Sequence, residues 1–301
     1  MDENKNKKTS IKKVVLKIAV SVGLLAYIIS KIDKQELVQH IKLLDYKFIP
    51  LIVVFIILNY IVSSIRWKQL LIHERSNEVS VGYLTSLYFI WSFFNNFMPT
   101  SIGGDVYKVY KLGKKINDNT FAFTSTFTER FTGVLILALF SVLSFAGFLK
   151  YWIILLLFWF VLSIYLGFVV LQKLSKRIKI LGKIYASLMT YKGHYKMMLR
   201  VFILAVIVQL MSLLTQYTIF LALGIKIDYF YALFTFPVIT LATFFIPSLN
   251  GIGVQDALYM SMFELVGVPK ELSLAASVLY HLFRLGVSLV GGVLYGLGKS
   301  D

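Results

Sequence analysis

Charged residues stand inside the most apolar stretches of this sequence, where they are rare. Glu129 and Arg130 are neighbours in one apolar run, and Arg284 lies in another near the C-terminus. A charge at the centre of a bilayer costs about 2.5–3.5 kcal/mol on insertion scales, so such residues pair with each other or line a cavity. A guanidinium matches phosphate oxygens with two parallel hydrogen bonds, which makes both arginines candidates for binding an anionic headgroup. The alternative for each arginine is a structural ion pair with Asp105 or Asp256.

Asp105 and Asp256 each fall near the start of a short segment that follows a break in an apolar run. A carboxylate there caps free N–H groups and complements the helix dipole; pairing with the arginines or coupling to protons is the alternative. His281 is either a proton relay or a packed, hydrogen-bonded histidine. Free N–H groups at helix N-termini also bind anions, so four glycines are candidates for close backbone approach to a phosphate. These glycines are Gly103, Gly104, Gly251 and Gly253.

Two breaks in the apolar runs, at Pro99 and Pro247, share one pattern. Each is a Phe-x-Pro followed by Ser or Thr, a glycine turn, an aspartate and then a long apolar run that carries an arginine. Interrupted apolar segments at corresponding positions of two halves point to the binding site of a transporter. The alternative is two ordinary Pro-Gly turns between helices. We predict that the breaks are corresponding parts of an internal repeat.

The elements that position these residues are long apolar runs. Hydrophobic residues make up 58% of the 301, with a mean hydropathy of +0.76, whereas soluble domains hold about 45–50%. The runs have the length of a spanning helix, about 17–25 residues, and lack the alternation of barrel strands. The sequence therefore predicts an all-α polytopic membrane protein. The runs lie at 14–31, 48–65, 81–97, 120–149, 151–172, 199–223, 230–246 and 273–297, with shorter segments at 102–113 and 253–266.

The basic residues predict the orientation of the chain. Lys and Arg number 31 against 15 Asp and Glu, which gives a formal net charge of +16. If the N-terminus is cytoplasmic and each short segment returns to the side it came from, most basic residues collect in the cytoplasm, including those at 66–80, 108–115 and 173–200. This threading has about six spanning helices, two re-entrant helical hairpins and both termini in the cytoplasm. It makes 1–301 a single membrane domain with an inverted repeat, composed of a first half 48–149, a basic cytoplasmic linker 173–198 and a second half 199–297.

Several classes of function are not expected. The absence of cysteine removes thiol nucleophiles and thiolate metal sites. The sequence has no cluster of His, Asp and Glu with metal-ligand spacing, and it has no nucleotide-binding glycine loop. We therefore expect no catalytic residue, metal or cofactor. The positive charge follows from membrane topology, so nucleic acid is not an expected partner. Because an intramembrane transferase needs only lone carboxylates, an enzyme remains an alternative.

Five short motifs in order resemble the flippase-like transmembrane domain of the lysylphosphatidylglycerol synthase family, over about residues 10–297. They are Arg66-Trp67, Pro99-x-x-x-Gly103-Gly104-Asp105, Glu129-Arg130-Phe131, Pro247-x-x-x-Gly251-x-Gly253 and the late Arg284. In the larger synthases a soluble aminoacyl-transferase domain follows; this sequence ends at Asp301 without one, so we do not expect lysyl transfer. The family commonly has Glu after its second Gly-x-Gly, where this chain has Gln255-Asp256.

The resemblance implies a lipid translocase of the cytoplasmic (inner) membrane. Its substrate would be an anionic or polyprenyl-phosphate-linked lipid, bound between the two hairpins with Arg130 and Arg284 holding the phosphate. The alternatives are a membrane-embedded lipid-modifying transferase and a scaffold for a glycosyltransferase. The expected partners are therefore a membrane lipid and a glycosyltransferase or lipid-modifying enzyme. Arg66-Trp67, at the end of an apolar run, is expected to anchor a helix at the membrane interface.

Overall fold

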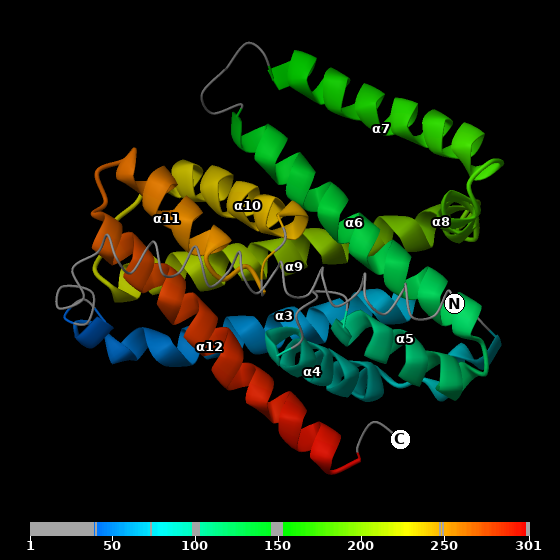
Figure 1. The fold of residues 1–301 in the computed structure, drawn as a ribbon, viewed down its shortest axis with the longest axis horizontal. Helices are drawn as coiled ribbons and strands as arrows, with labels where there is room; N and C mark the ends of the chain where they lie inside the picture. Colours follow the sequence, from blue (N-terminus) through cyan, green and yellow to red (C-terminus); the bar gives the residue numbers. More distant parts are fainter. Residues whose placement is uncertain are drawn as a thin grey trace, which may run out of the picture.

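The computed structural model describes Gln39, residues 41–72, 74–97 and 103–145, residues 153–246, Ser248 and residues 250–298. All regular structure in these residues is helical (Figure 1). The predicted first spanning run, at 14–31, lies outside the described residues. So do both predicted break residues, Pro99 and Pro247.

The same order of four helices occurs twice: a long helix, a helix of medium length, a short helix and another long helix. The first set is α3 (Ile49–Gln69), α4 (Val81–Phe97), α5 (Gly103–Ile116) and α6 (Asn119–Phe145), preceded by a 3-10 turn at Tyr46–Phe48 and interrupted by another at Glu74–Glu78. The second set is α9 (Tyr195–Ala222), α10 (Tyr229–Phe245), α11 (Val254–Glu264) and α12 (Lys270–Gly296). Between them stand α7 (Ile153–Ser175) and α8 (Lys179–Met189).

Aspartates set the starts of several helices. Asp118 accepts hydrogen bonds from the backbone N–H groups of Thr120 and Phe121, at 2.9 Å each, where α6 begins. Asp228 accepts from the N–H of Tyr231 at 2.9 Å where α10 begins. A side-chain acceptor there satisfies N–H groups that have no partner within the helix.

The two sets of helices pack on each other in a reciprocal way. α4 of the first set lies against α12 of the second, and α10 of the second lies against α6 of the first. Each short helix packs on the long helix that follows it, α5 on α6 and α11 on α12, while the corresponding helices α3 and α9 run along each other (Figure 1). A two-fold relation between the halves requires this reciprocity. That the halves are inverted in the bilayer stays a prediction.

Five helices in the described part of the chain are long and apolar enough to cross a membrane. They span Tyr46–Gln69, Asn119–Leu143, Phe158–Ser175, Tyr195–Ala222 and Lys270–Gly296. The protein is thus a polytopic all-α membrane protein, as predicted. α4 and α10 have 17 residues each, while α5 has 14 and α11 has 11. At 1.5 Å per residue even the longer two cover only about 26 Å of a core about 30 Å thick. Re-entry of the pairs α4–α5 and α10–α11 stays a prediction.

The basic linker is attached to one end of the bundle. Tyr191, just after α8, donates a hydrogen bond to the carbonyl of Leu70 at 3.1 Å, and Ser187 lies 3.1 Å, oxygen to oxygen, from Thr124. α8 therefore lies beside the end of α3 and the start of α6. α7 stands away from the bundle (Figure 1), and no residue of its apolar window Phe158–Ser175 is buried.

Candidate functional site

The first charged cluster of the site is centred on Glu129 in α6. Its carboxylate forms an ion pair with Arg66 from the end of α3 and lies 3.6 Å from Lys108 Nζ of α5. All three side chains are at most 5% exposed. Lys108 Nζ also lies over the rings of Tyr88, at 3.8 Å, and Trp67, at 4.3 Å. One buried carboxylate thus compensates two cations from different helices.

This cluster corrects one prediction and adds a finding about another residue. Arg66 and Trp67 do not anchor a helix at the membrane interface, because both are buried, at 4% and 0% exposure. Lys108, counted with the basic residues of the cytoplasmic side, is buried, with its side chain turned inward onto Glu129. In both cases a polar partner on another helix pulls the cation inward.

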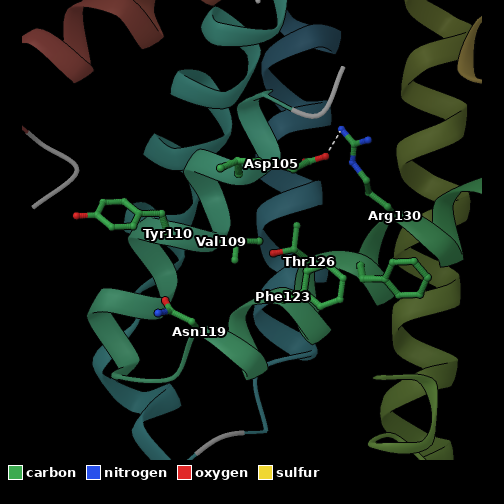
Figure 2. A pocket seen from close by; sticks show the side chains of 9 residues that line it. Asp105, Val109, Tyr110, Asn119, Phe123, Thr126 and Arg130 are labelled. Atoms are coloured by element: carbon green, nitrogen blue, oxygen red, sulfur yellow. Dashed lines mark ion pairs between the residues drawn. The ribbon is translucent and has the colours of Figure 1, made fainter. Parts of the chain in front are cut away.

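The second ion pair joins Arg130 of α6 to Asp105 of α5. Arg130 Nη2 lies 2.6 Å from Asp105 Oδ2, and the indole N–H of Trp91 donates to Asp105 Oδ1 at 2.9 Å. Figure 2 shows the pair at one end of a groove between α5 and α6. The groove has a volume of about 470 Å³, and most of its walls are apolar, including Val109 and Phe123. Of the two interpretations of Arg130, the structure shows the ion pair with Asp105.

Gly104, just after the first break, serves helix packing. A Cβ on Gly104 would lie 2.6 Å from the carbonyl oxygen of Trp91 and 2.8 Å from Asn95 Oδ1. Its N–H donates to that same Asn95 oxygen at 3.2 Å. Gly104 therefore lets α5 approach α4 closely, and its N–H is already bonded. Gly103 is the first residue of α5.

In the second half, Asp256 is bound by its own surroundings. It accepts hydrogen bonds from the N–H of Gly253 at 2.8 Å and the hydroxyl of Ser277 at 2.6 Å. His281 Nε2 lies 3.4 Å from Asp256 Oδ1, the oxygen that accepts from Ser277. Asp256 thus caps α11, as one interpretation predicted, and does not pair with Arg284. The N–H of Gly253 is occupied by this cap.

Arg284 contacts no carboxylate among the described residues. Within the described residues its guanidinium donates to the side-chain oxygen of Asn250 at 3.3 Å and lies 5.3 Å from the ring centre of Tyr280. It lines two cavities, of about 310 and about 260 Å³, which share four lining residues. These are Trp91, Thr240, Tyr280 and Arg284. Gly251, with a φ of +87°, lines the larger cavity.

A polar bridge joins the two halves beside Arg284. The amide of Asn250 donates to the side-chain oxygen of Asn96 at the end of α4, and Asn96 donates to Ser288 Oγ of α12 at 2.7 Å. No role was predicted from the sequence for Asn96 or Trp91. The two adjacent asparagines before the first break, in an otherwise apolar run, were the available signal.

The two halves therefore place corresponding residues differently. Asp105 and Asp256 are each the third residue of a short helix, α5 and α11. Asp105 forms an ion pair with Arg130, whereas Asp256 contacts His281. Among the described residues, Arg284 therefore has no carboxylate in contact. The predicted pair Arg130 and Arg284 does not share one cavity, because Arg130 lines the groove and Arg284 lines the two cavities.

The comparison with known families agrees with this architecture. The family described as the lysylphosphatidylglycerol synthase TM region matches residues 14–292. No curated protein matches the chain, and no solved structure does. The match covers all ten α-helices of the described residues except the last part of α12. The chain therefore belongs to the family of the lysylphosphatidylglycerol synthase transmembrane region, multi-pass membrane proteins of lipid metabolism or transport.

Proposed function

We propose that the chain is a lipid translocase of the cytoplasmic membrane that binds the phosphate of an anionic or polyprenyl-phosphate-linked lipid at Arg284. The observation that carries the proposal is the position of Arg284, a cation in the wall of two cavities that no carboxylate of the described part of the chain contacts. An arginine at membrane depth is costly without a counter-charge, and a lipid phosphate supplies one with matching geometry.

Arg130 supplies a second position for the phosphate in the proposed cycle. In this conformation Asp105 neutralises Arg130, while Arg284 is available. Trp91 stands between the two sites: it lines both cavities of Arg284, and its ring centre lies 5.9 Å from the Arg130 guanidinium. Rocking of one repeat against the other would exchange the two states, as in other repeat transporters. The apolar groove beside Arg130 would hold the lipid chain.

The proposed orientation places the basic end of the bundle in the cytoplasm. This end carries Lys114 and Lys115 at the end of α5 and Lys179 and Lys183 in α8. Cytoplasmic loops of membrane proteins carry an excess of Lys and Arg. Lys226, between α9 and α10, lies at the other end of α9 and would face outside.

The test is leaflet exchange of a fluorescent anionic lipid in vesicles that contain the purified protein. We expect Arg284→Ala to slow exchange by about 10- to 100-fold, because a hydrogen-bonded charge contributes about 1.5–3 kcal/mol. Arg284→Lys keeps the charge but loses the planar fork, so it should fall between. Lys270→Ala, at an exposed position of the same helix, is the matched control and should exchange like the wild type.

Three other outcomes contradict the proposal. Unchanged exchange in Arg284→Ala would remove the phosphate-binding role of this residue. Chemical conversion of the lipid by the purified protein would favour a transferase. Co-purification with a glycosyltransferase, with no exchange in vesicles, would favour a scaffold.

A further inference from the structure

We infer that the cavities at Arg284 select a lipid whose headgroup carries uncharged hydroxyl groups beyond its phosphate, and that they disfavour a headgroup that carries an ammonium group. The inference rests on the proposed function and narrows its substrate to a net-anionic lipid with a glycerol or sugar headgroup. The charges and hydrogen-bonding groups that line the two cavities support this selectivity.

The lining of both cavities holds a cation and lacks a carboxylate among the described residues. Arg284 supplies the positive charge, and neither cavity is lined by Asp or Glu. The nearest acidic residue along α11, Asp256, lines neither cavity, since Gly253, Ser277 and His281 surround its carboxylate. With the lipid phosphate bound to Arg284, an ammonium group of the same lipid would lie near a like charge and find no protein carboxylate as a partner, in a region of low dielectric.

The two aromatic residues that line both cavities, Tyr280 and Trp91, already contact cations of the protein. An ammonium binds over the face of an aromatic ring. Arg284 lies over the Tyr280 ring at 5.3 Å, and Arg130 lies over Trp91 at 5.9 Å. A cation of the protein therefore already occupies one face of each of these two rings.

The remaining polar groups of the cavities suit hydroxyls. The larger cavity is lined by the hydroxyls of Thr243 and Ser248 and the amide of Gln255, and the smaller one by the amides of Asn59 and Gln209. Each of these groups donates one hydrogen bond within the protein, which leaves the oxygen atoms and the second N–H of each amide for a ligand. Hydroxyls and amides both donate and accept hydrogen bonds, as the hydroxyls of glycerol and sugars do. A few convergent polar groups in a mainly apolar pocket fix the orientation of a ligand.

The experiment compares three lipids with the same acyl chains in one vesicle system. They are phosphatidylglycerol, which is anionic with free hydroxyls, phosphatidylethanolamine and lysylphosphatidylglycerol, which both carry an ammonium group. We expect phosphatidylglycerol to exchange about tenfold faster than either of the others, the loss caused by one unfavourable charged contact. Equal or faster exchange of lysylphosphatidylglycerol would overturn the inference and leave the translocase function standing.

Adding a carboxylate to the cavity should invert the preference. Gln255→Glu is nearly isosteric and lines the larger cavity, and Asn59→Asp lines the smaller one. We expect at least one of them to exchange lysylphosphatidylglycerol faster relative to phosphatidylglycerol than the wild type does. Gln172→Glu, exposed at the end of α7, is the matched control and should leave the ratio unchanged. An unchanged ratio in both folded cavity variants would overturn the inference.

Failure of the proposed function would look different. If no lipid exchanges at all, the translocase proposal is wrong, and selectivity is then measured as lipid binding to the purified protein in detergent. Thermal stabilisation by phosphatidylglycerol above that by lysylphosphatidylglycerol, lost in Arg284→Ala, would still support the inference. Equal stabilisation by the two lipids would overturn it.

Discussion

Glu129 has an energetic role that its sequence neighbour Arg130 does not share. Its carboxylate is buried between two cations from different helices, Arg66 of α3 and Lys108 of α5. Buried ion pairs add little net stability when intact, because both charges have lost their hydration. Removing one partner is far more costly, because the remaining charge stays buried without compensation.

We therefore predict that Glu129→Gln destabilises the protein by about 3–5 kcal/mol. The matched comparison is Glu264→Gln, which breaks the exposed ion pair with Lys270, whose side chains are 54% and 52% exposed. An exposed pair contributes about 0–1 kcal/mol, so this variant should melt like the wild type. Thermal unfolding in detergent, followed by tryptophan fluorescence, measures both. Equal melting temperatures of the two variants would contradict the prediction.

At this scale the sequence predicted the partners of some charged residues and not of others. The ion pair of Arg130 with Asp105 and the cap at Asp256 were both among the interpretations. The inward turn of Lys108 was not, because a lysine among other lysines reads as solvent-exposed. Which arginine lacks a carboxylate depends on the rotation of α12, which brings His281 to Asp256.

The packing of individual helices depends on small residues at crossings between the two halves. A Cβ on Gly291 of α12 would overlap the backbone carbonyl of Phe89 in α4. Gly292 faces the Phe93 ring of the same helix, where a Cβ would lie 2.7 Å from its Cε2 atom. Small residues let backbones approach closely where lipid gives no hydrophobic drive for helix association. These two glycines therefore let α12 approach α4 closely.

Gly291→Ala and Gly286→Ala should have opposite effects on stability, although both lie in α12. Alanine favours a helix by about 0.8–1 kcal/mol over glycine, and nothing lies within 4 Å of a Cβ on Gly286. Gly286→Ala should therefore stabilise slightly. Gly291→Ala must separate α12 from α4, which costs about 1–3 kcal/mol as overpacking does. Thermal unfolding in the same detergent compares them, and a stabilising Gly291→Ala would show that the crossing is looser.

Long apolar runs predicted most elements, while short ones depended on tertiary contacts. Predicted segments at 102–113 and 253–266 correspond to α5 and α11. The helix α8 inside the predicted linker was missed, because eleven residues form a marginal helix alone. Its contact at Ser187 with Thr124 comes from an element distant in the sequence.

At the scale of the whole molecule, the reciprocal packing of the halves was the feature hardest to predict. The repeat itself was visible in the two Phe-x-Pro breaks. That α4 would lie on α12 and α10 on α6 was not, because these contacts join residues such as Asn96 and Ser288, 192 positions apart. Apolar patterns show which faces are buried, and not which helix covers them.

The proposed orientation makes a direct prediction about labelling. The sequence has no cysteine, so single introduced cysteines have no background. Lys114→Cys and Lys183→Cys should react with a membrane-impermeant maleimide only after the cytoplasmic face is opened. Lys226→Cys should react in intact cells, because it lies beyond the opposite end of α9. Labelling of all three from the same side would contradict the threading.

The isolation of α7 has a consequence for how its sequence can vary. Since no residue of its window Phe158–Ser175 is buried, we expect hydrocarbon to surround most of these side chains. One apolar residue is then nearly interchangeable with another at the exposed positions, because few side chains of the described part of the chain fix its shape. Saturation mutagenesis with cell-surface abundance as the readout should find exchanges such as Phe158→Leu silent in α7, while the buried Phe236→Leu in α10 lowers abundance. Lysine at the middle of α7 should lower abundance as well, since lipid excludes the charge.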